Sequence, residues 1–313
     1  MRIVKKAEIE EALKSADVFS AIKNAFIQFS VGDVTTPPVG YLSFPEANGD
    51  LHIKFGHTKG DEVFVIKLST GFYDNLSKGL PSSNGLMMIL SAITGEPLAL
   101  LEDGGMLTDI RTAVAGALAS DLLKPNSSPR VGVIGTGIQA RLQVQYLSKL
   151  LPEATYSVWG RDKDKTATYI ADMAKAGLYV EIMSSPEDLC RSANIIISTT
   201  PSTSPIIKAE WIKAGTHITA VGADAPGKQE LEANLFQKAT FVAFDSKEQC
   251  LHHGEASHSP VEFKKRNSAE LGTVFKEPDI FTRKKSDITI ADLTGIAAQD
   301  IAIAKAVWSR LAP

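Results

Sequence analysis

The segment 131–140 has the residues and the spacing of a dinucleotide-binding turn. It reads Val-Gly-Val-Ile-Gly-Thr-Gly-Ile-Gln-Ala, an apolar run that leads into the pattern G-x-G-x-x-A. Gly135 permits a tight turn, Gly137 lets the backbone approach a pyrophosphate, and the free amides of the following helix attract phosphate. An ordinary glycine turn is the weaker interpretation, because a strand precedes the motif and a helical stretch follows it. We predict cofactor contacts from Gly135, Thr136, Gly137, Ile138, Gln139 and Ala140.

The next expected strand ends in Trp-Gly-Arg-Asp at 159–162. An acidic residue normally accepts the ribose hydroxyls of NAD at such a strand end, but Gly160 stands there and Arg161 follows. An arginine can pair with a 2′-phosphate, while Asp162 keeps NAD possible and Arg161 could simply be solvated. The sequence therefore predicts NAD(P) as cofactor, with a slight preference for NADP.

Arg111 and Lys67 are cations in apolar surroundings. Arg111 recurs with Leu107, Val114 and Leu118 on one face of a helix expected over 106–123. A structural ion pair or the carboxylate of a substrate would satisfy a guanidinium buried there, and the spacing does not separate the two.

Lys67 interrupts the apolar run 63–68 and shares a face with Val63 and Val65. A lysine that reaches out to water from a strand end is the commoner case in isolation. The alternative is a desolvated ammonium, whose pKa falls toward a value useful for proton transfer. Asp224 follows an expected strand at 217–221, where α/β sheets bind ligands, although alone it could cap a turn.

Two different frameworks must position these residues. The apolar residues Val18, Ile22, Phe26 and Phe29 predict an amphipathic helix over 15–31. Short apolar runs separated by turn residues predict a largely antiparallel sheet from 41–44, 51–55, 63–68, 85–91 and 97–102. A polar, proline-bounded linker at 124–129 then follows the helix 106–123.

Beyond the linker, strands at 131–134, 156–159, 194–198, 217–221 and 241–244 alternate with helices that begin at Gly137 and Lys163. This alternation favours a doubly wound parallel sheet. We predict an α/β protein with a Rossmann-type NAD(P)-binding domain, 125–293. The second domain is an α+β substrate-binding and dimerisation domain with a largely antiparallel sheet, 1–124, joined by a helix in 294–313.

The composition is that of an ordinary globular protein. The 313 residues are 44% apolar, and a net charge of -3, well mixed along the chain, gives no basic face for nucleic acid. Cys190 and Cys250 form no disulfide pattern, which fits a reducing compartment. The first residues lack the apolar core of a signal peptide, and no run is long enough to span a membrane. We expect a soluble, cytoplasmic protein without nucleic-acid or membrane partners.

The segment 250–258 gathers metal-ligand residue types, Cys-Leu-His-His-Gly-Glu-Ala-Ser-His. Its spacing matches no zinc pattern. We interpret it as a polar loop and predict no metal site.

Together these segments resemble the ornithine cyclodeaminase and mu-crystallin family over essentially the whole chain. The resemblance is specific at 65–67, 107–113, 135–140 and 220–228, the last of which reads Ala-Val-Gly-Ala-Asp-Ala-Pro-Gly-Lys. It implies that Lys67 is the catalytic lysine, that Arg111 holds the substrate carboxylate, and that Asp224 serves the substrate's amino groups. It also implies a homodimer formed through the mixed sheet. Further cofactor contacts are predicted at Ser83, Thr112, Thr199 and Val221.

One departure from the family concerns the substrate. The family usually supplies a second carboxylate-binding arginine before the first strands, and this chain has none between Arg2 and Arg111. Lys54 is the candidate replacement, although a solvated edge-strand lysine is at least as common.

The resemblance implies hydride transfer at the α-carbon of a small amino or imino acid. The best single reaction is conversion of L-ornithine to L-proline and ammonia, in which NAD(P)+ takes a hydride and later returns it. The alternative is an NAD(P)H-dependent ketimine or imino acid reductase, or an amino acid dehydrogenase. An alternative of another class is a non-catalytic, mu-crystallin-like nucleotide-dependent binding protein, which the joint presence of Lys67, Arg111 and Asp224 disfavours.

Overall fold

The computed structural model describes residues 1–263 and 267–311. The chain divides into two compact units, one formed by Met1–Arg111 with the chain from Ile296 onward, the other by Thr112–Gly295. The division falls inside helix α3, Met106–Leu122. The boundary predicted from the sequence lies later, at the linker 124–129 that follows this helix.

The first unit is built on a mixed sheet with the strand order β1-β7-β6-β5-β4-β2, and β3 also pairs with β4. β1 and β7 run parallel, and the other pairs among the described residues are antiparallel. The predicted antiparallel sheet is confirmed, with β1 and β2 as unpredicted additions. The strands are β1 Arg2–Lys5, β2 Val34–Thr35, β3 Gly40–Phe44, β4 Gly49–Thr58, β5 Val63–Phe72, β6 Ser83–Ser91 and β7 Pro97–Glu102.

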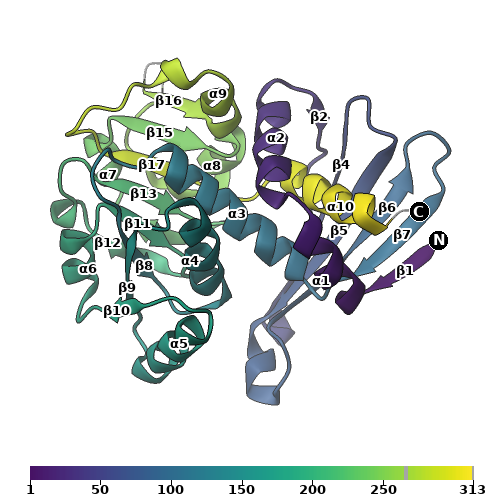
Figure 1. Ribbon diagram of the computed structural model, residues 1–313, viewed down its shortest axis with the longest axis horizontal. Helices are drawn as coiled ribbons and strands as arrows, with labels where there is room; N and C mark the ends of the chain where they lie inside the picture. The colour runs from purple at the N-terminus through teal and green to yellow at the C-terminus, as the bar shows by residue number, and fades with distance from the viewer. Residues whose placement is uncertain (264–266, 312–313) are drawn as a thin grey trace. The chain divides into compact units, whose positions relative to one another are not determined.

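Helices cover one side of this sheet. The first unit contains α1, Lys6–Ser15, α2, Val18–Ser30, and α10, Ala297–Leu311. α2 begins where the Asp17 side chain accepts a hydrogen bond from the Ser20 amide, at 3.0 Å. α10 lies beside α2 and against β4 and β5 (Figure 1). Both predicted helices are confirmed, and α10 belongs to the first unit. Short 3₁₀ turns occupy Pro45–Ala47 and Tyr73–Lys78.

The second unit is built on an all-parallel sheet with the order β10-β9-β8-β11-β13-β17-β15-β16. The order reverses between β8 and β11, and ligands of such sheets bind at the carboxyl ends of the strands beside this switch point. The predicted Rossmann-type sheet is confirmed. The strands are β8 Arg130–Ile134, β9 Thr155–Trp159, β10 Val180–Ile182, β11 Ile195–Ser198, β13 His217–Ala220, β15 Phe241–Phe244, β16 Ser268–Glu270 and β17 Thr289–Asp292.

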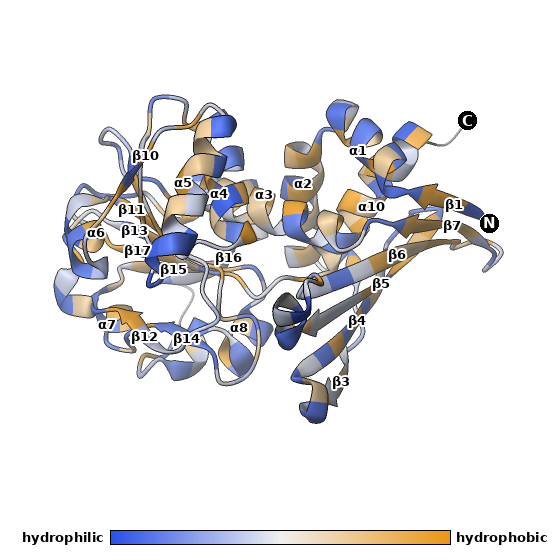
Figure 2. Cartoon of the chain, turned by 90° about the horizontal axis from the view of Figure 1, so that it is seen from below, coloured by the Kyte–Doolittle hydropathy of each residue, from blue (hydrophilic) through white to orange (hydrophobic). Residues whose placement is uncertain are grey.

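Buried strands explain the parallel sheet. Ile196, Ile218, Phe244 and Ile290 are fully buried in one cluster, and Figure 2 shows hydrophobic residues along the central strands. A separate pair, β12 Thr203–Ile207 and β14 Gln229–Leu231, lies outside this sheet. The helices are α4 Ile138–Leu150, α5 Lys163–Lys175, α6 Pro186–Ser192, α7 Leu235–Lys238, α8 Lys247–His253 and α9 Leu271–Lys276, with 3₁₀ turns at Ala209–Trp211, Glu255–His258 and Pro278–Ile280.

The prediction of a polar loop at 250–258 is wrong. α8 covers the first part of this segment and a 3₁₀ turn, Glu255–His258, the rest. The helix forms because Ser246 caps it and because Cys250 is fully buried, its thiol donating to Asp245 at 3.3 Å. In the described part of the chain, no helix is long and apolar enough to cross a membrane.

Candidate active site

Lys67 lies at the centre of a buried charged cluster in the first unit. The register of the sheet places it across from Lys54 on β4 and Met87 on β6. Its side chain is 2% exposed, and Nζ lies 3.0 Å from Oδ2 of Asp300 on α10. The ammonium therefore does not reach out to water, and the interpretation of Lys67 as a solvent-seeking strand residue is wrong.

Arg111 reaches the same carboxylate from α3. Its Nε lies 2.9 Å from Asp300 Oδ1, and its Nη1 donates to Gln299 Oε1 at 2.8 Å. Asp300 is as buried as Lys67, with 2% of its side chain exposed. The structural ion pair that was one of two alternatives for Arg111 is thus present. These contacts use Nε and Nη1, and a carboxylate-binding role for the guanidinium stays a prediction.

The surroundings of Lys67 and Asp300 lower the pKa values of both groups. Burial lowers the pKa of Lys67 to about 7; Asp300 opposes the shift, and Arg111 and Lys54 add to it. Burial alone would raise the pKa of Asp300, but Arg111, Lys67 and Lys54 hold it below its usual value. Asp300 is therefore ionised, and Lys67 can gain or lose a proton near neutral pH.

Asp300 and Gln299 are site residues that the sequence analysis missed. Asp300 stands four residues after Ile296 and three before Ile303 in the apolar stretch that predicted the last helix. This is the pattern that singled out Arg111, a charge on a face that must be buried, and the same argument applied to 294–311 would have found it.

The predicted dinucleotide turn joins β8 to α4. Gly135 has a φ of +116°, and a Cβ there would lie 2.6 Å from Thr199 Oγ1, so glycine is required. Gly137 begins α4 without a side-chain cap, and a Cβ built on it meets no atom within 4 Å. The open space and the uncapped helix amides fit a phosphate group.

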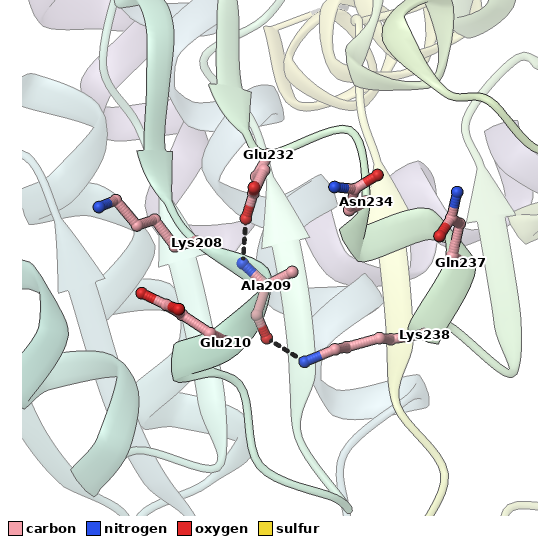
Figure 3. Close-up of a pocket in the computed structure, with 7 residues that line it drawn as sticks. All are labelled: Lys208, Ala209, Glu210, Glu232, Asn234, Gln237 and Lys238. Atoms are coloured by element: carbon pink, nitrogen blue, oxygen red, sulfur yellow. Dashed lines mark hydrogen bonds between the residues drawn. The ribbon is translucent and has the colours of Figure 1, made fainter.

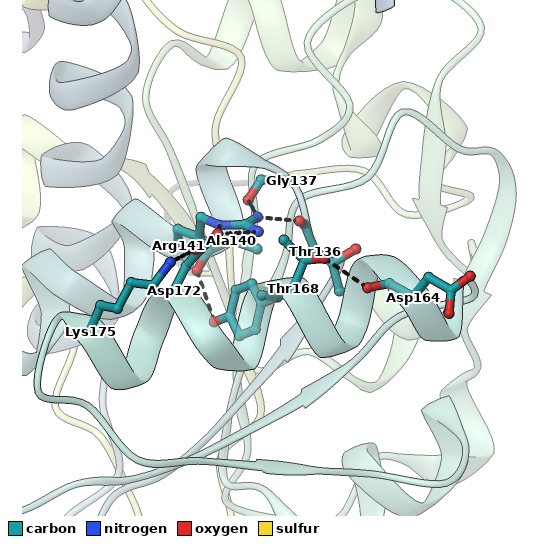
Figure 4. A network of polar contacts seen from close by, with 9 residues as sticks. Thr136, Gly137, Ala140, Arg141, Asp164, Thr168, Asp172 and Lys175 are labelled. Atoms are coloured by element: carbon teal, nitrogen blue, oxygen red, sulfur yellow. Dashed lines mark hydrogen bonds and ion pairs between the residues drawn. The ribbon is translucent and has the colours of Figure 1, made fainter.

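Arg141 braces this turn and was not predicted to do so. Its Nη1 donates to the carbonyl oxygens of Thr136 and Gly137, at 2.5 and 3.1 Å. Its Nε and Nη2 donate to Asp172 of α5, at 3.0 and 2.9 Å (Figure 4). The guanidinium also lies over the Tyr169 ring, 5.2 Å from the centroid. The turn is thereby tied to a second helix.

Glycine is required on steric grounds at position 160, where β9 has just ended. A Cβ there would lie 2.5 Å from Thr136 Cγ2 and 2.7 Å from Thr166 Oγ1. Asp162 Oδ1 caps α5 by accepting from the amides of Asp164 and Lys165, both at 3.0 Å. Arg161 is exposed.

The remaining predicted residues belong to both units. Thr199 and Val221 extend β11 and β13, with amides that donate to Ile134 and Ser198 oxygens, each at 3.0 Å. The Thr112 carbonyl accepts from Gln143 Nε2 of α4 at 3.2 Å, and Ser83 begins β6 in the other unit.

Asp224 lies in a loop after β13, with its Oδ1 2.5 Å from Lys228 Nζ. Lys54, Lys67 and Arg111 are brought together in the first unit, and Asp224 belongs to the second. The roles of Asp224 and Ser83 stay predictions.

An open pocket elsewhere in the second unit contains no predicted site residue (Figure 3). Glu232 accepts from the Ala209 amide at 2.7 Å, and Lys238 Nζ donates to the Ala209 carbonyl at 2.6 Å. These charged side chains hold the 3₁₀ turn at Ala209–Trp211.

A switch-point glycine turn and a separate unit with a buried lysine define a two-unit protein of the dinucleotide-binding class. The chain belongs to the ornithine cyclodeaminase/mu-crystallin family, whose match covers residues 1–312. A cyclodeaminase of Sinorhizobium fredii, described as uncharacterized, is 36% identical over 316 residues, which cover 99% of this chain and 96% of the relative.

Two solved structures share the whole fold. An archaeal alanine dehydrogenase dimer with bound NAD has a TM-score of 0.87 and 30% identity, with 99% of this chain and 95% of that chain covered. The iminosuccinate reductase of Paracoccus denitrificans in complex with NAD+ has a TM-score of 0.86 and 28% identity, with 99% and 96% covered.

Proposed function

We propose that this chain is a nicotinamide-dependent enzyme that transfers a hydride at the α-carbon of a small amino or imino acid. The observation that carries the proposal is the buried cluster in which two cations, Lys67 and Arg111, contact one carboxylate, Asp300. Family membership and the glycine turn at 135–140 support it.

A bound nicotinamide would accept or deliver the hydride. The chain's own residues would do the rest. Lys67, with its pKa lowered to about 7, would give a proton to an imine nitrogen or take one from an amine. Arg111 would bind the substrate carboxylate through its remaining nitrogen, Nη2, while Asp300 holds the guanidinium in place. Lys54, across from Lys67, would supply the second positive charge that the missing arginine leaves open.

Asp224 supports cyclodeamination of L-ornithine, because a carboxylate would favour a substrate with a second amino group. Lys54 in place of an arginine supports the second candidate, reduction of a cyclic ketimine or oxidation of an amino acid. Asp224→Asn should hurt turnover of ornithine more than that of a simple imine. NAD is the proposed cofactor by similarity to the two structures above, and Arg161 supports a test of NADP beside it.

The decisive experiment is a screen of small amino acids and cyclic imines with NAD and NADP, oxidised and reduced. Net oxidation or reduction is followed at the nicotinamide absorbance band, and L-proline is assayed directly because the cyclodeaminase regenerates its cofactor. Lys67→Met should lower kcat on the substrate found by about two to four orders of magnitude, the scale of a positioned acid or base, and leave dinucleotide affinity unchanged. Arg111→Lys keeps the charge but loses the planar fork, so it should mainly raise KM.

Lys305→Met is the matched control, since Lys305 pairs with Asp61 at the edge of the same unit. It should leave kcat and KM unchanged. Near-normal kcat for Lys67→Met would refute the catalytic assignment and favour a dinucleotide-dependent binding protein.

A further inference from the structure

We propose that Glu230 is a positioning residue that locks together the two loops carrying the cofactor and substrate residues of the second unit. This inference rests on the proposed function. Glu230 lies on β14 and is fully buried, and it belongs to none of the motifs that the sequence singled out.

The Glu230 carboxylate accepts hydrogen bonds from both loops. Oε1 accepts from the Thr200 amide at 2.6 Å, in the loop that follows β11. Oε2 accepts from the Gly222 amide at 2.9 Å, in the loop that follows β13, and from Ser198 Oγ at 2.8 Å. One side chain therefore joins the carboxyl ends of two adjacent parallel strands.

These two loops carry three of the proposed site residues. Thr199 directly precedes Thr200, Val221 directly precedes Gly222, and Asp224 follows two residues later. The approach is close, because a Cβ on Gly222 would lie 2.2 Å from the Thr200 carbonyl oxygen and 2.4 Å from Glu230 Oε2. A shift of Glu230 would therefore move both loops.

Two further buried carboxyl groups, Glu255 and Asp292, lie behind Glu230, and Glu255 contacts it directly. Glu255 accepts from the amides of Glu230 and Leu231, at 2.6 and 3.0 Å. Asp292, at the end of β17, accepts from the amides of Glu255 and Ala256, at 3.2 and 2.8 Å. These hydrogen bonds run from the end of β17 to β14 and restrain the backbone at Glu230.

Two backbone N–H groups, which can only donate, point at the Glu230 carboxyl group. Burial raises the pKa of Glu230 to about 7, and these hydrogen bonds oppose the shift. An amide in its place would turn an NH₂ group toward at least one of these two N–H donors and could not carry the negative charge that favours both bonds. Glu230→Gln therefore tests the proposal with almost no change of volume.

Dinucleotide affinity by calorimetry, kcat and KM on the substrate found by the screen, and thermal unfolding should be measured for Glu230→Gln. Dinucleotide affinity and kcat should each fall about tenfold or more, the scale of one hydrogen bond to a charged group. Ser198→Ala removes one hydrogen-bond partner of Glu230 and keeps its carboxyl group. It should also lower dinucleotide affinity and kcat, but by a smaller factor. It keeps the test decisive if Glu230→Gln does not fold.

Glu232→Gln is the matched control, because Glu232 also accepts from a backbone amide, that of Ala209, but at the pocket away from both loops. It should lower the unfolding temperature and leave affinity and kcat unchanged. Unchanged affinity and kcat in folded Glu230→Gln, with Ser198→Ala also unchanged, would overturn the inference, as would equal losses in Glu232→Gln. Failure of the wild-type protein to bind NAD or NADP would instead overturn the proposed function and this inference with it.

Discussion

Asp300 is the anion that contacts both Lys67 and Arg111, and it raises the pKa of Lys67. Without that anion, a lysine buried beside an arginine would lose its proton at a pH well below the physiological range. Burial and the neighbouring positive charges both lower its pKa. The carboxylate at 3.0 Å raises it again. Lys67 therefore keeps a proton that it can donate to an imine nitrogen near neutral pH.

Asp300→Asn should therefore lower the pKa of Lys67 below about 7, because the charge of the Asp300 carboxylate and its hydrogen bond both raise that pKa. In the reductive direction, where Lys67 must be protonated, kcat/KM should begin to fall at a lower pH than in the wild type. In the oxidative direction, where Lys67 must be neutral, kcat/KM should reach its plateau at a lower pH. Profiles of kcat/KM against pH in both directions measure the shift.

The same variant removes the anion from a buried pair of cations, so its free energy of unfolding should fall by about 3 to 5 kcal/mol. Asp61→Asn, which breaks the partly exposed pair with Lys305, is the control and should cost about 1 kcal/mol or less. A pH profile identical to that of the wild type in a folded Asp300→Asn protein would show that Asp300 serves stability alone.

At the scale of elements, the local signals in the sequence were sufficient for most strands and for the five longest helices of the described residues. Alternation and turn residues located the strands from 41 to 102, and strand-helix alternation located β8, β9, β11, β13 and β15. β1 escaped because it has four residues with one buried side chain and owes its place to pairing with β7. Such pairing is a tertiary effect that no local pattern carries.

The residues of the candidate site likewise fall into those that a local sequence pattern reveals and those that only tertiary contacts reveal. The glycine turn, Lys67 and Arg111 were found because each combines an unusual residue with a recognisable element. The contact of Asp300 with Lys67 and Arg111 could not be found from local pattern, since it joins α10 to β5 and α3 across most of the chain. The hydrogen bonds from Arg141 to the turn depend on the rotamer of Arg141 and on its contact with Asp172 of α5, which no local pattern predicts.

The turn between β8 and α4 is the element on which cofactor binding depends. Gly137→Val would place a branched side chain in the space before the helix amides, so the affinity for NAD and for NADP should fall together by about tenfold or more. Calorimetry on folded protein measures it. Arg161→Ala is the comparison: if Arg161 binds a 2′-phosphate, it should weaken NADP by about 1.5 to 3 kcal/mol and spare NAD. Unchanged affinity for both cofactors in Gly137→Val would refute the prediction that this turn binds the phosphates.

At the scale of the whole molecule, the sheet of the first unit has two different faces. The register places Lys54, Lys67, Met87 and Leu101 in one cross-strand row, and the last three of these are buried. The neighbouring row on the other face is Phe55, Ile66, Met88 and Leu100. Members of this second row are only partly buried, and Phe55 is 36% exposed. An apolar row left open on one sheet face is typical of a surface that another chain covers.

We therefore expect a homodimer in which this row is covered by a second copy, in line with the predicted dimerisation through the mixed sheet. Sedimentation at low micromolar concentration should give twice the chain mass of 33.6 kDa. Met88→Glu places a charge in the middle of the row and should shift the protein to the monomer, because an unpaired charge at the centre of an interface is costly. Ile93→Glu is the matched control, an equally drastic change at a turn residue that is 76% exposed, and it should leave the mass at that of the dimer. A wild-type protein that sediments at 33.6 kDa, or a Met88→Glu protein that stays dimeric, would place the interface elsewhere or remove it.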